Sequence, residues 1–570
     1  MTSRRVFALG WRLARWQPAL FAKGVAQWSI FWASPLAVGL ALQAIFDAIA
    51  GQRPAQLGLT TLFAVVAAVE GTRLALLCVM VRTWVRWWTR TQALLRTNML
   101  RAQLASGGPA AGPPLADSGA AVTVFRDDVE DLIRFIDTWV DVGAATLFTA
   151  LAIPVMLRID PTVTLVVAVP LALAAVVTRL LANPLRAYRQ ADREATERLT
   201  GFLGSVFSSV LAIKVGGAER AVLARLRGLN AARQRTALRD RLLSDGLESF
   251  NGSIVDVAIG VVLLLVAPAM RGGEFTVGDL VLFASYIETL SALPRWAGRL
   301  LVRHRQAQVA MGRMAALMPG RDPAAVVAHR RLPLDGTAPP PRPRPSAQQP
   351  ADVRIRGLSC RFADGRGIGG IDLDLPAGSF TVLCGPVGAG KTTLLRALLG
   401  LLGPVEGTVA WNGEAIADLA AHMVPPRCAC LPQVPRLFSA SLRDNLTLGV
   451  ATEQEALAAA VRRAALNADI ARMAEGLDTV VGPRGVRLSG GQVQRAATAR
   501  ALLAAPALLI LDDLSSALDG ETERLLWTRL LDEPGPRPTC LVVSHRPAAL
   551  ERADQIIVLE AGRIHTVTHR

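Results

Sequence analysis

Six long apolar stretches in the first half of the chain constrain its fold more than any other feature. A helix needs roughly 20 consecutive apolar residues to cross the hydrocarbon core of a membrane, and each stretch reaches about that length. The stretches are Gly24–Ile49, Leu57–Val85, Trp139–Leu157, Pro161–Leu181, Leu247–Met270 and Val277–Leu301. One of them alone could be a buried helix, but six could not easily be packed into a soluble core. The pattern predicts an α-helical transmembrane domain with six spans over residues 24–318.

The connections between these stretches alternate in length and in charge. The turns at 50–56, 158–160 and 271–276 carry one arginine each, whereas the long connections at 86–138 and 182–246 are rich in arginine. Basic residues concentrate in the cytosolic loops of membrane proteins. The chain is therefore predicted to be a multi-pass protein of the cytoplasmic membrane, with its N-terminus, both long connections and its second half in the cytosol. A net charge of +16 could also indicate a nucleic-acid partner. The clustering of arginine between the apolar stretches fits cytosolic loops better, so no nucleic-acid partner is expected.

The long connections have few helix breakers, so we expect helices that continue the spans into the cytosol. Their tips, near Gly112–Ala121 and Val210–Glu219, are where elements that couple the two halves of the chain are expected. Before the first span, residues 1–23 alternate basic and aromatic side chains and predict a helix on the membrane surface. A proline-rich linker is predicted at 319–350, followed by an α/β domain over 351–570.

A phosphate-binding loop opens this α/β domain. Residues 385–392 read Gly-Pro-Val-Gly-Ala-Gly-Lys-Thr and fit the pattern GxxxxGK[ST] in full. An apolar run, Phe380–Cys384, precedes the loop and a helical pattern follows it, as phosphate binding at a helix N-terminus requires. Lys391 is one of three lysines in the chain and is predicted to reach the β- and γ-phosphates of ATP. Thr392 is predicted to bind Mg²⁺.

A second motif supplies a carboxylate for the metal. Leu508–Leu511 is a short apolar strand that ends at Asp512. Such a strand is common in protein cores, but downstream of a phosphate loop it predicts that Asp512 joins the Mg²⁺ shell.

The segment Leu488-Ser489-Gly490-Gly491-Gln492 resembles the LSGGQ signature of ABC transporters. Further segments resemble the family's motifs in the same order. They are Gln433 after Leu431-Pro432 (the Q-loop), Ser516-Ala517-Leu518-Asp519 (the D-loop), Ser544-His545-Arg546 (the switch histidine) and Phe362 (the adenine-stacking aromatic). The resemblance covers Val353–Ile564, and the six-span half resembles the exporter type of half-transporter. The predicted fold class is therefore a helical six-span domain joined to an α/β P-loop ATPase cassette.

The resemblance implies ATP and Mg²⁺ as cofactors and a dimer in which ATP lies between the phosphate loop of one subunit and the signature of the other. The implied catalytic residues are Asp513, His545 and Gln433, and the implied metal ligands are Thr392, Gln433 and Asp512. The implied nucleotide-binding residues are Phe362, Gly385, Pro386, Val387, Gly388, Ala389, Gly390, Lys391, Thr392, Thr393, Ser489, Gly490, Gly491 and Gln492.

Two positions depart from the family's pattern. Asp513 stands where the family usually has the Glu that polarises the attacking water, and Asp is one methylene shorter. Either the chain pairs with a different subunit, for which its signature completes a fast site, or a homodimer adapts so that Asp513 does the work. Pro483 stands where exporters usually have Glu in a segment that touches the cytosolic loops.

Ionisable residues inside the spans are candidates for function. Glu70 and Arg73 lie one helical turn apart and are expected either to serve transport or to form a structural ion pair. Asp256 stands alone in the fifth span.

The sequence thus favours an ATP-driven exporter. The alternative is a regulatory subunit whose partner hydrolyses ATP, and an importer fits less well because importers usually keep spans and cassette on separate chains. Lipid, peptide, drug and siderophore-like cargo all stay open.

Overall fold

The computed structural model describes residues 3–54, 57–105, 118–272, 274–318, 322–332, 343, 346, 348–362, 365–402, 405–482, 485–515, 517–533 and 537–570. The chain divides into two compact units. One comprises residues 1–100 and 117–332, and the other comprises residues 333–570 with 101–116. We call them the membrane unit and the cassette.

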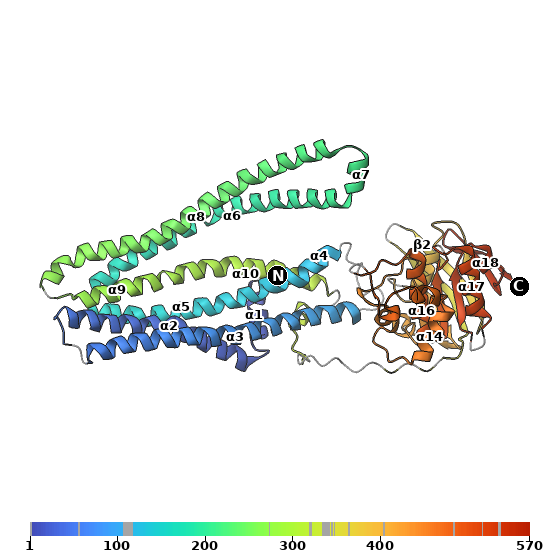
Figure 1. The fold of residues 1–570 in the computed structure, drawn as a ribbon, viewed down its shortest axis with the longest axis horizontal. Helices are drawn as coiled ribbons and strands as arrows, with labels where there is room; N and C mark the ends of the chain where they lie inside the picture. Colours follow the sequence, from blue (N-terminus) through green and yellow to red (C-terminus); the bar gives the residue numbers. More distant parts are fainter. Residues whose placement is uncertain are drawn as a thin grey trace. The chain divides into compact units, whose positions relative to one another are not determined.

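The membrane unit consists of helices (Figure 1). They are α1 (Ser3–Ala14), α2 (Pro18–Ile49), α3 (Leu59–Ala105), α4 (Ser118–Thr123), a π-helical turn (Val124–Asp128), α5 (Val129–Ile159), α6 (Pro161–Ser208), α7 (Val210–Val215), α8 (Glu219–Gly272), α9 (Val277–Leu290), α10 (Ala292–Ala316) and a 3₁₀ turn (Pro323–Ala325).

Within the described residues, five helical segments are long and apolar enough to cross a membrane. They contain the expected spans one, two, three, five and six. The expected fourth span falls within α6, whose apolar described segment, Pro161–Pro170, is shorter. The prediction that the long connections continue the spans as helices is confirmed, because α3, α6 and α8 run for 47, 48 and 54 residues. Residues 106–117, which hold most of the first expected tip, lie outside the described residues.

Helix boundaries follow local chemistry. Asp160 caps α6, since its carboxylate accepts the N–H groups of Thr162 and Val163 at 2.7 and 3.0 Å, and Pro161 occupies the first helical position. Thr276 and Asp279 form a reciprocal capping box at the start of α9. Because these caps end the turns at Asp160 and Thr276, the connections from α5 to α6 and from α8 to α9 are as short as the sequence indicated.

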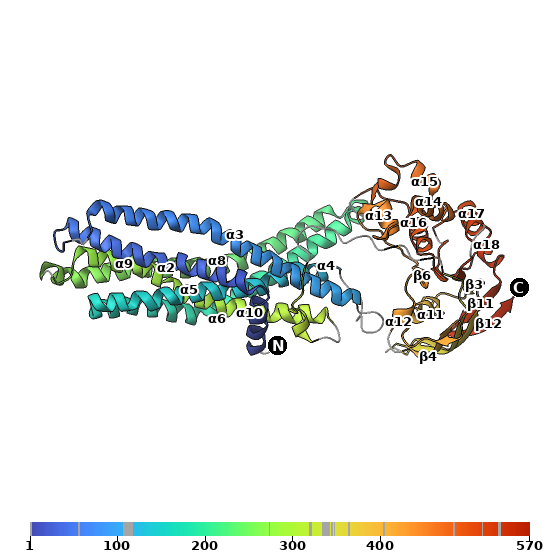
Figure 2. The same ribbon diagram turned by 90° about the horizontal axis from the view of Figure 1, so that it is seen from below.

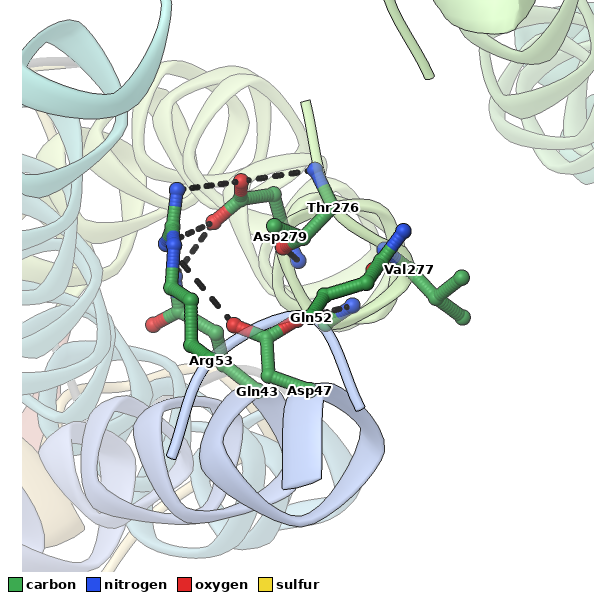
Figure 3. Close-up of polar contacts among 8 residues, drawn as sticks. Gln43, Asp47, Gln52, Arg53, Thr276, Val277 and Asp279 are labelled. Carbon is green, nitrogen blue, oxygen red and sulfur yellow. Dashed lines mark hydrogen bonds and ion pairs between the residues drawn. The ribbon is translucent and has the colours of Figure 1, made fainter. Parts of the chain in front are cut away.

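The C-terminal part of α2 docks tightly against the N-terminal end of α9 (Figure 3). A side chain at Gly278 would lie 2.2 Å from the carbonyl oxygen of Gln43, so only glycine fits there. Asp279 is fully buried and accepts from Gln43 Nε2 at 2.5 Å and from both terminal nitrogens of Arg53 at 3.4 Å. Asp47 is also buried and accepts from the Gly278 N–H at 2.9 Å. The buried carboxylates of Asp47 and Asp279 thus both pair with Arg53. These contacts link α2 to α9.

The α6–α8 pair is built differently. These two helices pack along each other and diverge from the other helices toward α7, at the expected second tip (Figure 1). Large apolar side chains on them are solvent-exposed within the chain, for example Leu165, Leu180, Phe207, Leu242 and Leu264. These side chains are therefore left uncovered by the described part of the chain.

The cassette is an α/β domain. Its strands are β1 (Val353–Arg361), β2 (Gly367–Leu375), β3 (Phe380–Cys384), β4 (Glu406–Trp411), β5 (Glu414–Ala415), β6 (Cys428–Leu431), β7 (Ala440–Ser441), β8 (Val480–Val481), β9 (Leu508–Asp512), β10 (Thr539–Val543), β11 (Gln555–Glu560) and β12 (Arg563–His569). Its helices are α11 (Lys391–Leu398), α12 (Leu419–His422), α13 (Leu442–Thr447), α14 (Gln454–Arg463), α15 (Asn467–Ala471), a 3₁₀ turn (Gly476–Asp478), α16 (Gly490–Leu503), α17 (Gly520–Leu531) and α18 (Pro547–Leu550).

The main sheet has the order β12-β11-β3-β10-β9-β6, with every neighbouring pair parallel except β11 and β12. A second, antiparallel sheet has the order β2-β1-β4-β5. Strands β9 and β10 are buried at every position, as expected for a parallel sheet covered on both faces. Because β3, β6, β9 and β10 run parallel, the residues that follow their carboxyl ends meet at one edge of the sheet.

Candidate functional site

The phosphate loop connects β3 to α11 at that edge. Gly385 has φ +141°, and a side chain there would lie 2.1 Å from the carbonyl oxygen of Leu559. Gly390 caps α11 with φ +101°, a left-handed conformation that L side chains rarely adopt. The loop is thereby forced into a tight turn at the N-terminus of a helix, which is an anion-binding arrangement.

Lys391 and Thr392 begin α11 directly after the phosphate loop. The Lys391 ammonium donates to the carbonyl oxygens of Gly385 and Pro386 at 2.8 Å each, so it lies over the loop. The Thr392 hydroxyl donates to Asp512 Oδ2 at 3.0 Å. Since hydroxyl and carboxylate oxygens are preferred ligands of Mg²⁺, this pair fits the predicted metal site.

Asp512 ends β9 and is only 6% exposed. Burial raises its pKa above the ordinary range of an aspartate, and the neighbouring charge of Asp513 adds to this shift, while the Thr392 hydrogen bond opposes it. The raised pKa means that burial disfavours the charged form of Asp512. A cation bound nearby would stabilise that charge.

The predicted catalytic residues follow the ends of three neighbouring strands. Asp513 follows β9, His545 lies two positions beyond β10, and Gln433 lies two positions beyond β6. The Asp513 N–H donates to Val543 O at 3.2 Å, which links the ends of β9 and β10. Asp513 has φ +53°, a region in which Asp is more common than most residues. His545 and Gln433 are exposed at the edge that holds the phosphate loop.

Phe362 follows β1 in the turn to β2, where its side chain is 45% exposed. The turn is closed by the Phe362 N–H, which donates to Arg366 O at 2.8 Å. The first residues of β2 lie against the phosphate loop, because a side chain at Gly390 would come 3.0 Å from Ile368 Cγ2. An exposed aromatic ring on this turn fits a stacking role.

The signature starts α16. Ser489 caps the helix through the Gln492 N–H at 3.3 Å, and Gln492 returns the contact to the Ser489 N–H at 2.8 Å. The reciprocal box leaves the first N–H groups of α16 as a second anion site. Gly491 is buried, and a side chain there would lie 2.8 Å from Ala517 O.

Supporting contacts around the signature were not predicted from the sequence. Asp469 accepts from Gln492 Nε2 at 3.0 Å and from Arg495 Nη2 at 2.6 Å. Arg546, next to His545, donates to Leu518 O and to the buried Glu523, both at 2.9 Å. The sequence gives no local pattern for the Arg546–Glu523 contact, because the two residues are 23 positions apart. The one hint in the sequence is the charge of Arg546 next to the recognised His545.

Two predicted features lie outside the described residues, namely Pro483 and Ser516 of the D-loop. In the part of the cassette that is described, no hydrogen bond or ion pair joins residues 489–492 to residues 385–393. Within the described residues, the phosphate loop and the signature of one chain thus make no polar contact with each other.

The ionisable residues of the spans differ in their contacts. Glu70 and Arg73 form an ion pair at 3.3 Å, and the Arg73 guanidinium also lies 4.7 Å from the centre of the Phe31 ring. This geometry favours a structural pair. Asp256 is exposed on α8 and makes no ion pair with another described residue.

A phosphate loop, a buried carboxylate beside it and a helix-capping signature, joined to apolar spanning helices, define a membrane-embedded nucleotide-binding protein. Family models agree with this class: residues 32–293 match the ABC transporter transmembrane region, and residues 368–516 match the ABC transporter model. The chain belongs to the ABC transporter family and has the half-transporter arrangement, with spans and cassette on one chain.

Individual relatives give the same picture. The chain is 38% identical over 223 residues to the ATP-dependent lipid A-core flippase of Burkholderia orbicola, a match that covers 39% of this chain and 37% of that relative's length. It is 30% identical over 437 residues to the mycobactin import ATP-binding/permease protein IrtB of Mycolicibacterium thermoresistibile, covering 74% of this chain and 70% of the relative. The fold resembles that of a bacterial Atm1-family ABC exporter with ATP bound, at a TM-score of 0.74 and 22% identity, over 97% of this chain and 95% of the other.

Proposed function

We propose that the chain is an ATP-driven exporter that works as a dimer in the cytoplasmic membrane, with its cassette in the cytosol. The observation that carries the proposal is the pair of complete half-sites, the phosphate loop and the signature, which are separate within one chain. Two chains arranged head to tail complete two ATP sites. Closing the cassettes around ATP then drives the spans from inward- to outward-facing, and hydrolysis resets them.

The α6–α8 pair supports a dimer. Its exposed apolar side chains are of the kind that lipid or a second chain covers. The tip of the pair, α7, carries exposed Leu211 and Val215. An exposed apolar tip beyond the predicted spans fits the coupling role that the sequence predicts near Val210–Glu219.

Mg²⁺ is held, in this proposal, by Thr392 and Asp512 with Gln433 as a further ligand. The metal supplies charge neutralisation for the phosphates. Lys391 and the N–H groups of the loop bind the β- and γ-phosphates, the hydroxyl of Ser489 and the N–H groups of α16 bind the γ-phosphate from the second chain, and Phe362 stacks on the adenine. Asp513 orients the attacking water, and His545 contacts the γ-phosphate.

Asp513 also keeps a second candidate function open. Because its side chain is one methylene shorter than that of Glu, the water could be poorly held in this chain's own site. A heterodimer, in which this chain supplies its signature to a faster partner, is the alternative. Its cargo, like that of the exporter, stays undefined, since the relatives' names refer to lipid A-core and to mycobactin.

The two candidates predict different ATPase rates for the purified chain alone in lipid nanodiscs. The exporter hydrolyses ATP as a homodimer, and Lys391→Ala reduces the rate by about 10³-fold because a cation at the developing charge is lost. Arg563→Ala, an exposed basic residue of the same cassette, is the matched control and retains the rate. A wild-type rate no higher than that of Lys391→Ala would favour the regulatory subunit.

A further inference from the structure

The segment that leaves α10 toward the cassette, residues 322–332, is held by the N-terminal helix. We call it the exit segment. Arg5 Nη2 lies 2.6 Å from Asp322 Oδ1. The Trp16 indole N–H donates to Arg330 O at 3.0 Å, and His329 Nε2 lies 2.7 Å from Arg12 O, a bond that the Nε2–H tautomer donates. Three contacts spread over both segments fix the exit segment along α1.

Helix α3 holds the same segment from a second direction. The Asn98 side-chain amide donates to the carbonyl oxygens of Val326 and Ala328 at 2.9 Å each. Val326 and Val327 are fully buried. The exit segment is therefore packed into the membrane unit before the chain continues to the cassette.

Helix α1 lies crosswise to α2 and α3 (Figure 2), and only residues 15–17 separate it from α2. Its Phe7 ring stacks on Trp139 and on His304, with ring centres 5.5 and 4.9 Å apart. Trp139 begins the predicted third span, and His304 lies three residues after the end of the predicted sixth. Helix α1 thus crosses the bundle where the spans are expected to leave the membrane on the arginine-rich side.

The two faces of α1 have opposite character. Val6, Leu9, Gly10 and Leu13 are buried, at the spacing of one helical face. The opposite face exposes a set of basic and aromatic side chains, to which the exit segment adds two arginines. The set is Arg4, Trp11, Arg12, Arg15, Arg330 and Arg331, and we call it the basic surface.

The chemistry of the basic surface indicates its partner. The one acidic residue in α1 and the exit segment is Asp322, and it is already paired with Arg5. Trp11 is 50% exposed, and the Arg15 guanidinium lies 5.2 Å from the centre of its ring. Exposed tryptophan with arginine, next to a span, is typical of a surface that meets lipid headgroups.

We propose that the basic surface binds the anionic phospholipid headgroups of the cytosolic leaflet and thereby fastens the exit segment to the membrane. The lipid then determines how firmly the connection to the cassette is held. The proposal rests on the cytosolic orientation proposed above, but not on hydrolysis or on the direction of transport.

Hydrogen exchange of the backbone amides in residues 326–332 tests this in full-length protein in nanodiscs. Replacing phosphatidylcholine stepwise by phosphatidylglycerol is expected to slow exchange by about tenfold or more, since each arginine near an anionic surface contributes roughly a fivefold preference. The variant Arg4→Gln/Arg12→Gln/Arg15→Gln loses this dependence. The control Arg227→Gln/Arg235→Gln/Arg239→Gln, which removes equal charge from exposed positions on α8, retains it.

Further arms distinguish the lipid surface from other causes. Exchange that is independent of phosphatidylglycerol in the wild type, or equally dependent in the triple α1 variant, would overturn the proposal. So would equal slowing by glycerol phosphate added to phosphatidylcholine nanodiscs, which would indicate free anions. Arg5→Asp is expected to speed exchange in every lipid, and adding Asp322→Arg to it is expected to restore slow exchange and its lipid dependence.

Discussion

The phosphate loop and the signature, which we propose to be two halves of one ATP site, are built differently by the chain. The phosphate loop lies at the carboxyl edge of the sheet, where Gly385 leaves no room for a side chain beside the backbone of β11 and where the neighbouring Asp512 is buried. The signature is an exposed helix start, closed by the reciprocal box of Ser489 and Gln492. In the proposed function both segments bind ATP, whereas hydrolysis depends on Asp513, which stands where the family usually has Glu.

The largest effect is expected from blocking the signature. Ser489→Arg removes the cap of α16 and places a long cation where the second chain's γ-phosphate binds, so ATPase activity should fall by about 10²–10³-fold. Ser489→Thr keeps the capping hydroxyl and should stay within a few-fold of the wild type. An active Ser489→Arg dimer would mean that the signature takes no part in the site.

The next largest effect is expected at Asp513, the carboxylate beside the phosphate loop. Asp513→Asn keeps the size of the side chain and removes its charge, so the steady-state ATPase rate should fall by about 100-fold if Asp513 handles the water. Asp513→Glu should match or exceed the wild type, because it restores the family's usual reach. An unchanged rate in Asp513→Asn would assign the role to another group.

A smaller effect is expected from packing beneath the signature. Gly491→Ala would place a methyl group 2.8 Å from Ala517 O, whereas Gly490→Ala makes an ordinary contact of 3.4 Å with Ala517 Cβ. Overpacking of this kind costs about 1–3 kcal/mol. The thermal unfolding midpoint of the cassette should therefore be lower in Gly491→Ala than in Gly490→Ala, and equal midpoints would contradict the close approach.

The smallest effect concerns the buried Asp512. The pKa of Asp512 is raised in the folded cassette, so the folded state takes up this proton at a higher pH than the unfolded chain does. The contribution of Asp512 to the free energy of unfolding, measured without nucleotide, therefore increases as pH falls. Asp512→Asn removes the cost of the buried charge. Its midpoint should exceed that of the wild type near neutral pH, and the difference should shrink toward acidic pH. A constant difference would mean that Asp512 does not titrate in this way.

Much of the fold and of the two half-sites could be predicted because their signals are local. An apolar run of 20 or so residues is sufficient for a membrane helix, and the phosphate loop and the signature are continuous segments whose glycines and caps determine their own backbone. The helical extensions of α3, α6 and α8 followed from the lack of breakers.

The unpredicted features join residues that are far apart in the sequence. The Gln43–Asp279 hydrogen bond spans 236 positions, and the Arg5–Asp322 pair spans 317. Neither Asp279 nor Gly278 differs in local pattern from an ordinary helix start, so only the packing of α2 against α9 reveals why they are needed. The contacts of the exit segment likewise depend on where α1 and α3 meet in space.

The central claim is that each ATP site forms between two chains, and cross-linking two singly labelled chains tests it directly. Val387 in the phosphate loop and Gly490 in the signature are exposed, so each can be replaced by Cys after the exposed Cys78 and Cys430 are changed to Ser. Chains with Val387→Cys and chains with Gly490→Cys are co-assembled and treated with a short bifunctional thiol reagent. We predict a covalent dimer of the two different chains that increases with Mg²⁺ and ATP. No covalent dimer under these conditions, together with an internal cross-link in a chain that carries both changes, would contradict the account.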